Sequence, residues 1–176
     1  MMQSVPGSFE SDVARFIPNL RAFARSLTRN VEDADDLVQE TLIRAFSNFE
    51  RLVPGSNLKA WLFTILRNTH ISHIRKRRNE VLQQHDDQVE LVAVQEGQSS
   101  RMDLLDFTNA LETLPEDQRE ALLLVGAEGF SYEDAALMCG CAVGTIKSRV
   151  NRARTKLAEM LDVETQTQST SSQLSA

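Results

Sequence analysis

The chain has 176 residues, an apolar fraction of 41% and a net charge of −6. This composition can bury a core in one domain or two small ones, which excludes disorder throughout, and the negative charge taken alone argues against nucleic acid binding. No apolar run of about 20 residues is present to span a membrane, and we find no secretion signal. Two cysteines, Cys139 and Cys141, cannot form a disulfide framework, so we expect a reduced, cytoplasmic protein.

Apolar residues recur with helical spacing through most of residues 9–74. The first stretch runs from Phe9 to Leu27 and contains Pro18, which should kink or break the helix. Two more helices are predicted over residues 34–49 and 58–74. No segment alternates with a period of two over the length of a strand. We therefore predict an all-α fold made of two small helical domains.

Acidic residues open the predicted helix that begins near Asp33. Carboxylates at a helix N-terminus complement the helix dipole, so this pattern has a purely structural interpretation. An acidic face with an exposed isoleucine could equally dock a basic helix of a partner protein, and the spacing does not decide between the two interpretations. The residues on the face opposite the apolar stripe are Asp36, Gln39, Glu40, Ile43 and Arg44.

A loop at residues 50–57 precedes the helix that carries Trp61, and window 67–78 of that helix holds five cations and no acid. A loop, an aromatic helix and a row of cations suit single-stranded DNA, whose bases need stacking and whose backbone needs positive charge. Trp61 shares the apolar stripe, so we interpret it as a core residue. His70 and His73 lie among the cations, where repulsion disfavours a metal pair, and we expect them to contact solvent or phosphate.

The helical pattern is interrupted between residues 80 and 101. Acids, several glutamines and Gly97 accompany one short apolar run there, which predicts a flexible acidic linker. We therefore expect one domain at residues 8–79 and another at 102–162, each small enough to have a marginal core by itself. Residues 163–176 are rich in Gln, Ser and Thr and are expected to form a disordered tail.

The second domain contains the pattern of a helix-turn-helix motif. Ser131 is placed to cap a short helix, Gly140 permits a sharp turn, and a longer helix follows from about Val143. Window 147–156 of the longer helix holds five cations and no acid. A solvated basic face is the structural alternative, but the unbroken sign of the charge, the short preceding helix and the turn favour binding in the major groove of DNA.

Taken together, these segments resemble the extracytoplasmic-function sigma factors of bacterial RNA polymerase, and within them the general stress response group of alphaproteobacteria. The resemblance covers about residues 8–160, in the order and two-domain layout of that family. Many members have proline where this chain has Ala142. The segments that carry the resemblance are Asp35–Thr41, Trp61–Asn68, Leu114–Pro115, Ser131–Ala136 and Gly140–Arg149.

The resemblance implies three sets of functional residues. The first domain, sigma region 2, would bind the largest subunit of core polymerase through a docking set made of Asp35, Asp36, Gln39, Glu40 and Arg44. The loop at 50–57 and the helix after it would capture a base flipped from the −10 element, with a −10 set made of Asn57, Arg67, Asn68, Arg75, Lys76, Arg77 and Arg78. The second domain, sigma region 4, would read −35 bases through Lys147, Ser148, Asn151 and Arg152 and hold phosphates through Thr145, Arg149 and Arg154, which together form the −35 set.

The implied partners are core RNA polymerase, promoter DNA and an anti-sigma factor, with no cofactor, no metal and no small-molecule substrate. No nucleophile–base pair or phosphate-binding glycine loop predicts an enzyme, and Cys139 and Cys141 lack the further ligands that zinc needs. A sigma-like decoy that titrates an anti-sigma protein would not need the cationic helix, and a one-component repressor would not need the acidic docking helix. We also expect the free chain to bind DNA poorly, because its acidic remainder opposes the two cationic windows.

Overall fold

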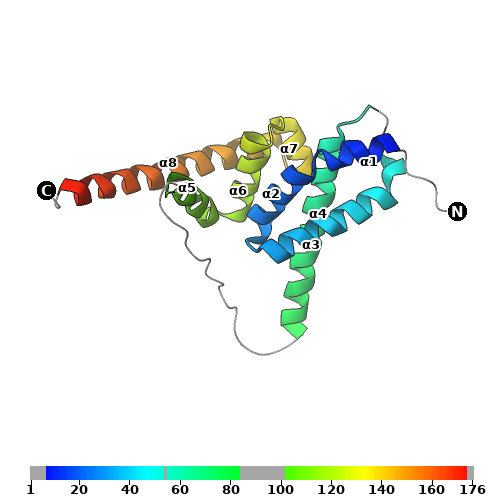
Figure 1. Cartoon of the computed structure of the whole chain (residues 1–176), viewed down its shortest axis with the longest axis horizontal. Helices are drawn as coiled ribbons and strands as arrows, with labels where there is room; N and C mark the ends of the chain where they lie inside the picture. The colour runs from blue at the N-terminus through cyan, green and yellow to red at the C-terminus, as the bar shows by residue number, and fades with distance from the viewer. Residues whose placement is uncertain (1–6, 54, 84–101, 174–176) are drawn as a thin grey trace. The chain divides into compact units, whose positions relative to one another are not determined.

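The computed structural model describes residues 7–53, 55–83 and 102–173, and every regular element among these residues is helical (Figure 1). The chain divides into two compact units. Helices α1 to α4 precede residues 84–101, and helices α5 to α8 follow them. The all-α prediction is therefore confirmed. Most of the predicted linker lies outside the described residues.

The first unit begins with α1 (Gly7–Ala14) and α2 (Ile17–Thr28). Pro18 lies in the first turn of α2, so the chain breaks just before it, as the sequence predicts. Helix α3 (Val31–Ser47) is capped by Asn30, whose side-chain oxygen accepts hydrogen bonds from two backbone N–H groups at 2.8 and 3.3 Å. A short 3-10 turn, η1 (Phe49–Arg51), leads through the loop to α4 (Leu58–Gln83).

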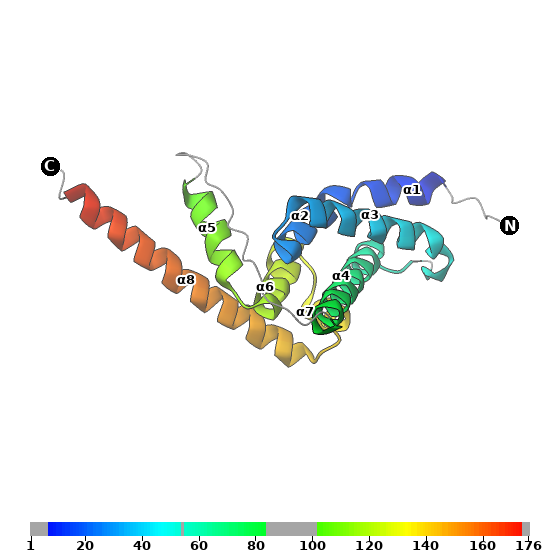
Figure 2. The same cartoon turned by 90° about the horizontal axis from the view of Figure 1, so that it is seen from below.

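The core of the first unit lies where α2 and α4 pack against α3. Figure 1 shows α4 crossing α3, and Figure 2 shows α2 beside α3. Thr41 and Thr69 are also buried, and each donates its hydroxyl to the backbone carbonyl four residues earlier, at 2.7 and 2.9 Å. The buried apolar residues on these three helices include Leu20, Phe23, Leu27, Leu37, Val38, Leu62, Phe63 and Leu66.

The second unit contains α5 (Met102–Thr113), α6 (Glu116–Leu122), the π-helical turn η2 (Leu123–Ala127), α8 (Val143–Gln173) and the residues of α7 (Tyr132–Cys139) up to Ala136. Both α5 and α6 pack against α8. A cluster formed by Ala110, Leu114, Ala153 and Leu157 joins α5 to α8, and Ile146 and Val150 are buried on the same side of α8.

The helix-turn-helix has the capping residue, the glycine turn and the start of the second helix that the sequence predicts. The Ser131 hydroxyl oxygen accepts a hydrogen bond from the backbone N–H of Asp134 at 2.9 Å, so Ser131 caps α7. Gly140 has φ of +63°, a left-handed conformation that side chains disfavour. Helix α8 then begins at Val143, where the sequence placed it.

Helix α8 is longer than the sequence predicts. It continues to Gln173, through residues for which composition predicted a disordered tail. No glycine or proline occurs after Gly144, so nothing in the local sequence ends the helix. Helix α4 likewise continues to Gln83, past the domain boundary expected at residue 79.

Candidate promoter-binding and docking surfaces

The outward side of α3 carries the predicted docking face. Asp36 and Gln39 are exposed, and Ile43 is 65% exposed beside them. The buried side of the same helix holds Leu37 and Val38. The helical period thus separates a core stripe from a surface that combines one carboxylate, one amide and one apolar side chain, which suits a protein partner.

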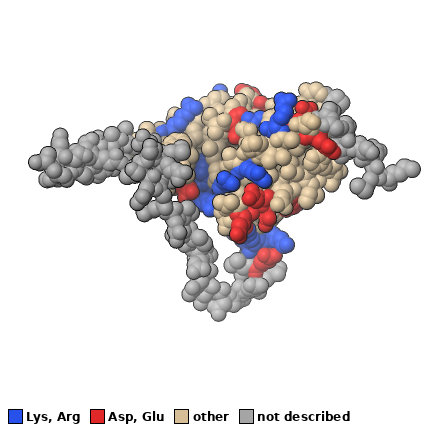
Figure 3. All heavy atoms as spheres, in the orientation of Figure 1, with Lys and Arg blue, Asp and Glu red and all other residues tan. Residues whose placement is uncertain are grey.

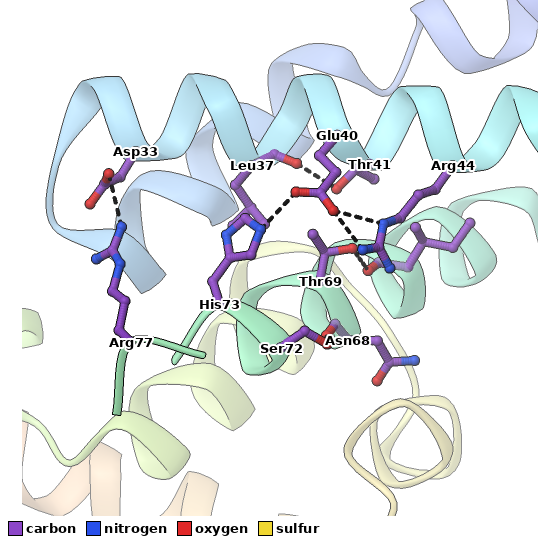
Figure 4. A network of polar contacts seen from close by, with 11 residues as sticks. Asp33, Leu37, Glu40, Thr41, Arg44, Asn68, Thr69, Ser72, His73 and Arg77 are labelled. Carbon is purple, nitrogen blue, oxygen red and sulfur yellow. Dashed lines mark hydrogen bonds and ion pairs between the residues drawn. The ribbon is translucent and has the colours of Figure 1, made fainter. Parts of the chain in front are cut away.

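The other members of the docking set lie on the flanks of α3 and contact neighbouring helices. The Asp35 carboxylate pairs with the Arg21 guanidinium of α2 at 3.5 Å. On the opposite flank, Glu40 lies between two basic side chains, as Figure 4 shows. Its Oε2 atom is 2.7 Å from His73 Nε2 on α4, and its Oε1 atom accepts hydrogen bonds from Nε (2.9 Å) and Nη2 of Arg44.

These contacts set the charge state of Glu40. Burial raises the pKa of this carboxyl, but hydrogen bonds from Arg44 and His73, together with the charges of both side chains, outweigh burial. The net result is a pKa below the usual value near 4.5. Glu40 is therefore an ionised and already partnered member of the docking set.

A second contact joins α3 to α4 near the start of α3. The Arg77 guanidinium donates to Asp33 Oδ1 at 3.1 Å. The space-filling view shows acidic side chains adjoining basic ones over this part of the first unit (Figure 3). One of the cations in the predicted −10 set is thus neutralised by an acid of the same unit.

The remaining −10 residues lie along α4. Asn57 caps the helix through its side-chain oxygen, which accepts the Ala60 backbone N–H at 3.1 Å. Arg67 is half-buried, and Lys76 lies 3.9 Å from Glu80 in an exposed pair. The exposed members of the set in this helix are Asn68, Arg75, Lys76, Arg77 and Arg78.

The structure corrects the expectation for one of the two histidines, His70. His70 is buried, at 8% exposure, because it lies one helical turn after Leu66 on the face that packs into the core. His73 contacts Glu40. The His70 side chain is therefore not presented to solvent or phosphate, whereas the His73 side chain stays 36% exposed beside Glu40.

A hollow of about 260 Å³ lies between the end of α3 and the start of α4. It adjoins Asn68, one of the predicted −10 residues, and Arg44, one of the predicted docking residues. Trp61 both lines the hollow and packs against Phe9, with ring centroids 6.4 Å apart, so it is more than a core residue. The full lining is Arg44, Asn48, Arg51, Trp61, Ile65 and Asn68.

The predicted −10 set did not include Asn48 or Arg51, although Arg51 belongs to the loop at 50–57 that was predicted to capture a base. Asn48 lies at the end of α3, just before the loop at 50–57, and Arg51 is the second residue of that loop. The available signal was the position of Arg51 within that loop and of Asn48 two residues before it. Cations, amides and an indole ring around one hollow are the groups that bind phosphate, base edges and base faces.

Helix α8 presents the predicted −35 set on its outward side. Lys147, Asn151, Arg152 and Arg154 are exposed, whereas Thr145, Ser148 and Arg149 are half-buried. The inward side carries Ile146, Val150 and Ala153, each at 1% exposure or less. The apolar stripe therefore fixes the helix on its unit while the polar residues remain accessible for a groove of DNA.

Two residues of the −35 set are held by neighbours in the second unit. Arg149 Nε pairs with Asp117 Oδ2 of α6 at 3.0 Å, so this side chain anchors α8 to α6. The Lys147 ammonium lies over the Tyr132 ring, 5.7 Å from its centroid. A hollow of about 340 Å³ adjoins these last two residues and Asn151.

Comparison with known proteins decides the family. The model for sigma-70 region 2 matches residues 13–80, and the model for sigma-70 region 4 matches residues 104–157. The ECF RNA polymerase sigma factor EcfG of Rhodopseudomonas palustris is 57% identical over 157 residues, which are 89% of this chain and 87% of that protein. The chain belongs to the extracytoplasmic-function sigma factors of the sigma-70 family.

Solved structures agree with the family assignment of this sigma factor. The sigma factor RpoE of Bartonella quintana, in complex with the anti-sigma factor NepR, is 52% identical and has a TM-score of 0.79, with 90% of this chain and 99% of that chain covered. CnrH in complex with the cytosolic domain of CnrY is 30% identical, with a TM-score of 0.65 and 88% of each chain covered.

The family assignment gives each unit a role in transcription initiation. Region 2 corresponds to the first unit, with its α3 face and its hollow, and region 4 corresponds to the helix-turn-helix of the second unit. Within the described residues, no helix is both long and apolar enough to cross a membrane, and no group of three metal-ligating side chains converges.

Proposed function

We propose that this sigma factor directs core RNA polymerase to promoters through three separate surfaces. The outward face of α3 docks on the polymerase, the hollow beside Trp61 receives an unpaired base of the −10 element, and the outward face of α8 reads the −35 element. The observation that carries the proposal is the accessibility of Asn151 and Arg152 opposite the buried stripe of α8. Asn and Arg make bidentate hydrogen bonds to base edges.

The hollow supports the proposed role in promoter opening. Arg44 and Arg51 supply cations for a phosphate, Asn48 and Asn68 supply amides for a base edge, and Trp61 supplies an aromatic surface. A base enters such a site only after it leaves the duplex stack, so capture of the base favours the melted state of the promoter.

We infer that the chain acts as a specificity subunit in the cytoplasm rather than as an enzyme, and that an anti-sigma factor controls it. The support for this control is similarity to RpoE, which was solved with the anti-sigma factor NepR. Membership of the stress response group suggests a stress regulon. A decoy that only titrates the anti-sigma protein is disfavoured, because the cationic face of α8 is intact and accessible.

The test of the whole proposal is reconstituted transcription with core polymerase and a library of promoters.

The docking face is tested by the affinity of the chain for core polymerase. Ile43→Asp should weaken this affinity at least about tenfold, because it places a charge where an apolar side chain meets the partner. Val31→Asp is the matched control, since Val31 is 56% exposed at the first residue of the same helix, away from Ile43 and Gln39. Failure of the wild-type chain to initiate on every promoter would favour the decoy, and equal core affinity of the two variants would exclude the α3 face as the docking site.

A further inference from the structure

Arg44 lies where two proposed surfaces meet. It projects from the flank of α3 beside the docking face, and it lines the hollow together with Trp61 and Asn68. A strand captured in that hollow brings at least one phosphate close to the lining, because each base is attached to a charged backbone. The charge that Arg44 can offer therefore bears directly on strand affinity.

In the free chain the Arg44 guanidinium is already paired with a carboxylate. Two donors of the Arg44 guanidinium, Nε and Nη2, bond to the same oxygen of Glu40. The second oxygen of Glu40 contacts His73 of α4. Glu40 thus neutralises Arg44 at the edge of the hollow and is itself held in place from two sides, as Figure 4 shows.

We propose that Glu40 is a positioning residue that keeps Arg44 engaged in the free chain, and that a cation of core polymerase that binds the Glu40 carboxylate releases Arg44 to the DNA strand. Docking on α3 and strand capture in the hollow are then coupled through one carboxylate. This inference rests on the proposed function of both surfaces. It adds that Glu40 links them and that Arg44 changes partner when the complex forms.

The expected size of the coupling follows from the exposure of the pair. The side chains of Arg44 and Glu40 are 47% and 36% exposed, and exposed ion pairs make weak contributions. Removing the competing carboxylate should therefore raise strand affinity about two- to fivefold. Because coupling between two binding sites is reciprocal, a bound strand should strengthen docking by the same factor.

The experiment uses the full chain and short homopolymeric DNA strands, one for each base. Trp61 is the only tryptophan in the sequence and lines the hollow, so quenching of its fluorescence reports a base that enters. Glu40→Gln should bind the strands about two- to fivefold more tightly than the wild-type chain. Glu32→Gln removes the same charge from an exposed position of α3 and should leave the affinity nearly unchanged, because salt screens distant exposed charges.

A double-mutant cycle assigns the effect to Arg44. In the Arg44→Ala background, Glu40→Gln should no longer raise strand affinity. The inference is overturned if the gain persists without Arg44, or if Glu32→Gln produces an equal gain. Either outcome would show that general electrostatics, and not the release of one guanidinium, controls strand binding.

The assembled holoenzyme separates this inference from the proposed function. With core polymerase at saturation, the wild-type chain and Glu40→Gln should bind a labelled strand equally, as judged by its fluorescence anisotropy, because docking has already released Arg44 in the wild type. A persistent two- to fivefold advantage of the variant there would contradict the coupling. If neither holoenzyme binds the strand, the proposed function of the hollow fails, whatever the free chains show.

Discussion

The cationic surfaces of the two units differ in how much of their charge is free to act. In the first unit, acids of α3 hold basic residues of α3 and α4, through Glu40 with Arg44 and His73 and through Asp33 with Arg77. In the second unit, Arg152 and Arg154 form no ion pair within the described part of the chain, and Arg149 alone of the −35 set is paired with an acid there.

This difference suggests two modes of DNA recognition in one protein. The face of α8 is preformed, so duplex binding requires little rearrangement of charge. In the proposed −10 surface, Arg77 and the adjoining Arg44 are held by acids of the same unit, so strand binding at these two residues must compete with those contacts. Competition of this kind suits a surface that should act only after core polymerase has docked.

The largest effect is expected from the preformed face. Arg152→Ala should weaken −35 recognition by about 1–3 kcal/mol, or roughly 5- to 150-fold, and should relax sequence preference, because a base contact is lost without any competing partner. The measurement is holoenzyme binding to a promoter library randomised in the −35 element. Arg25→Ala, which removes an exposed cation from α2, should leave the profile unchanged. An unaltered preference in Arg152→Ala would remove this residue from the −35 set.

Loss of the paired cation of the second unit should lower stability more than loss of an unpaired one. Arg149→Ala should lower the free energy of unfolding by about 1 kcal/mol, because it breaks the half-buried pair with Asp117 that ties α8 to α6. Arg154→Ala on the exposed side of the same helix should change that free energy by less than about 0.5 kcal/mol. Urea denaturation compares the two. Equal losses would show that the pair does not anchor the helix.

The smallest effect concerns pH and the first unit. Because the folded state lowers the pKa of Glu40, its contribution to stability is present above the usual value near 4.5 and is lost as the pH falls through the lowered pKa. The contribution should stay below about 1 kcal/mol, since the side chain is 36% exposed. The wild-type chain should therefore exceed Glu40→Gln in stability at neutral pH, and the difference should vanish in acid. Denaturation curves that differ by a constant amount at every pH would contradict the assignment.

Much of the fold could be predicted because its signals are local. The apolar period of α3 predicted which face is buried, and Leu37 and Val38 are indeed in the core. Ser131, Gly140 and Val143 marked the helix-turn-helix through capping and backbone conformation, which depend on neighbouring residues alone. The length of α8 was not predicted, because the polar composition of residues 163–176 was interpreted as disorder. No glycine or proline occurs after Gly144 to end the helix.

The candidate sites were predicted less completely because they combine residues from separate elements. Asn48 and Arg51 join Trp61 and Asn68 only when the end of α3 packs beside the start of α4. The burial of His70 likewise depends on packing of α4, which the basic residues around it in the sequence obscured.

The sequence by itself determined an all-helical fold, the outward face of its recognition helix and the acids that open α3, because helical periodicity and end-capping act over a few residues. Only the tertiary structure decided which of those charges meet. Glu40 precedes His73 by 33 residues and Asp33 precedes Arg77 by 44, yet each pair is in contact, because α4 crosses α3.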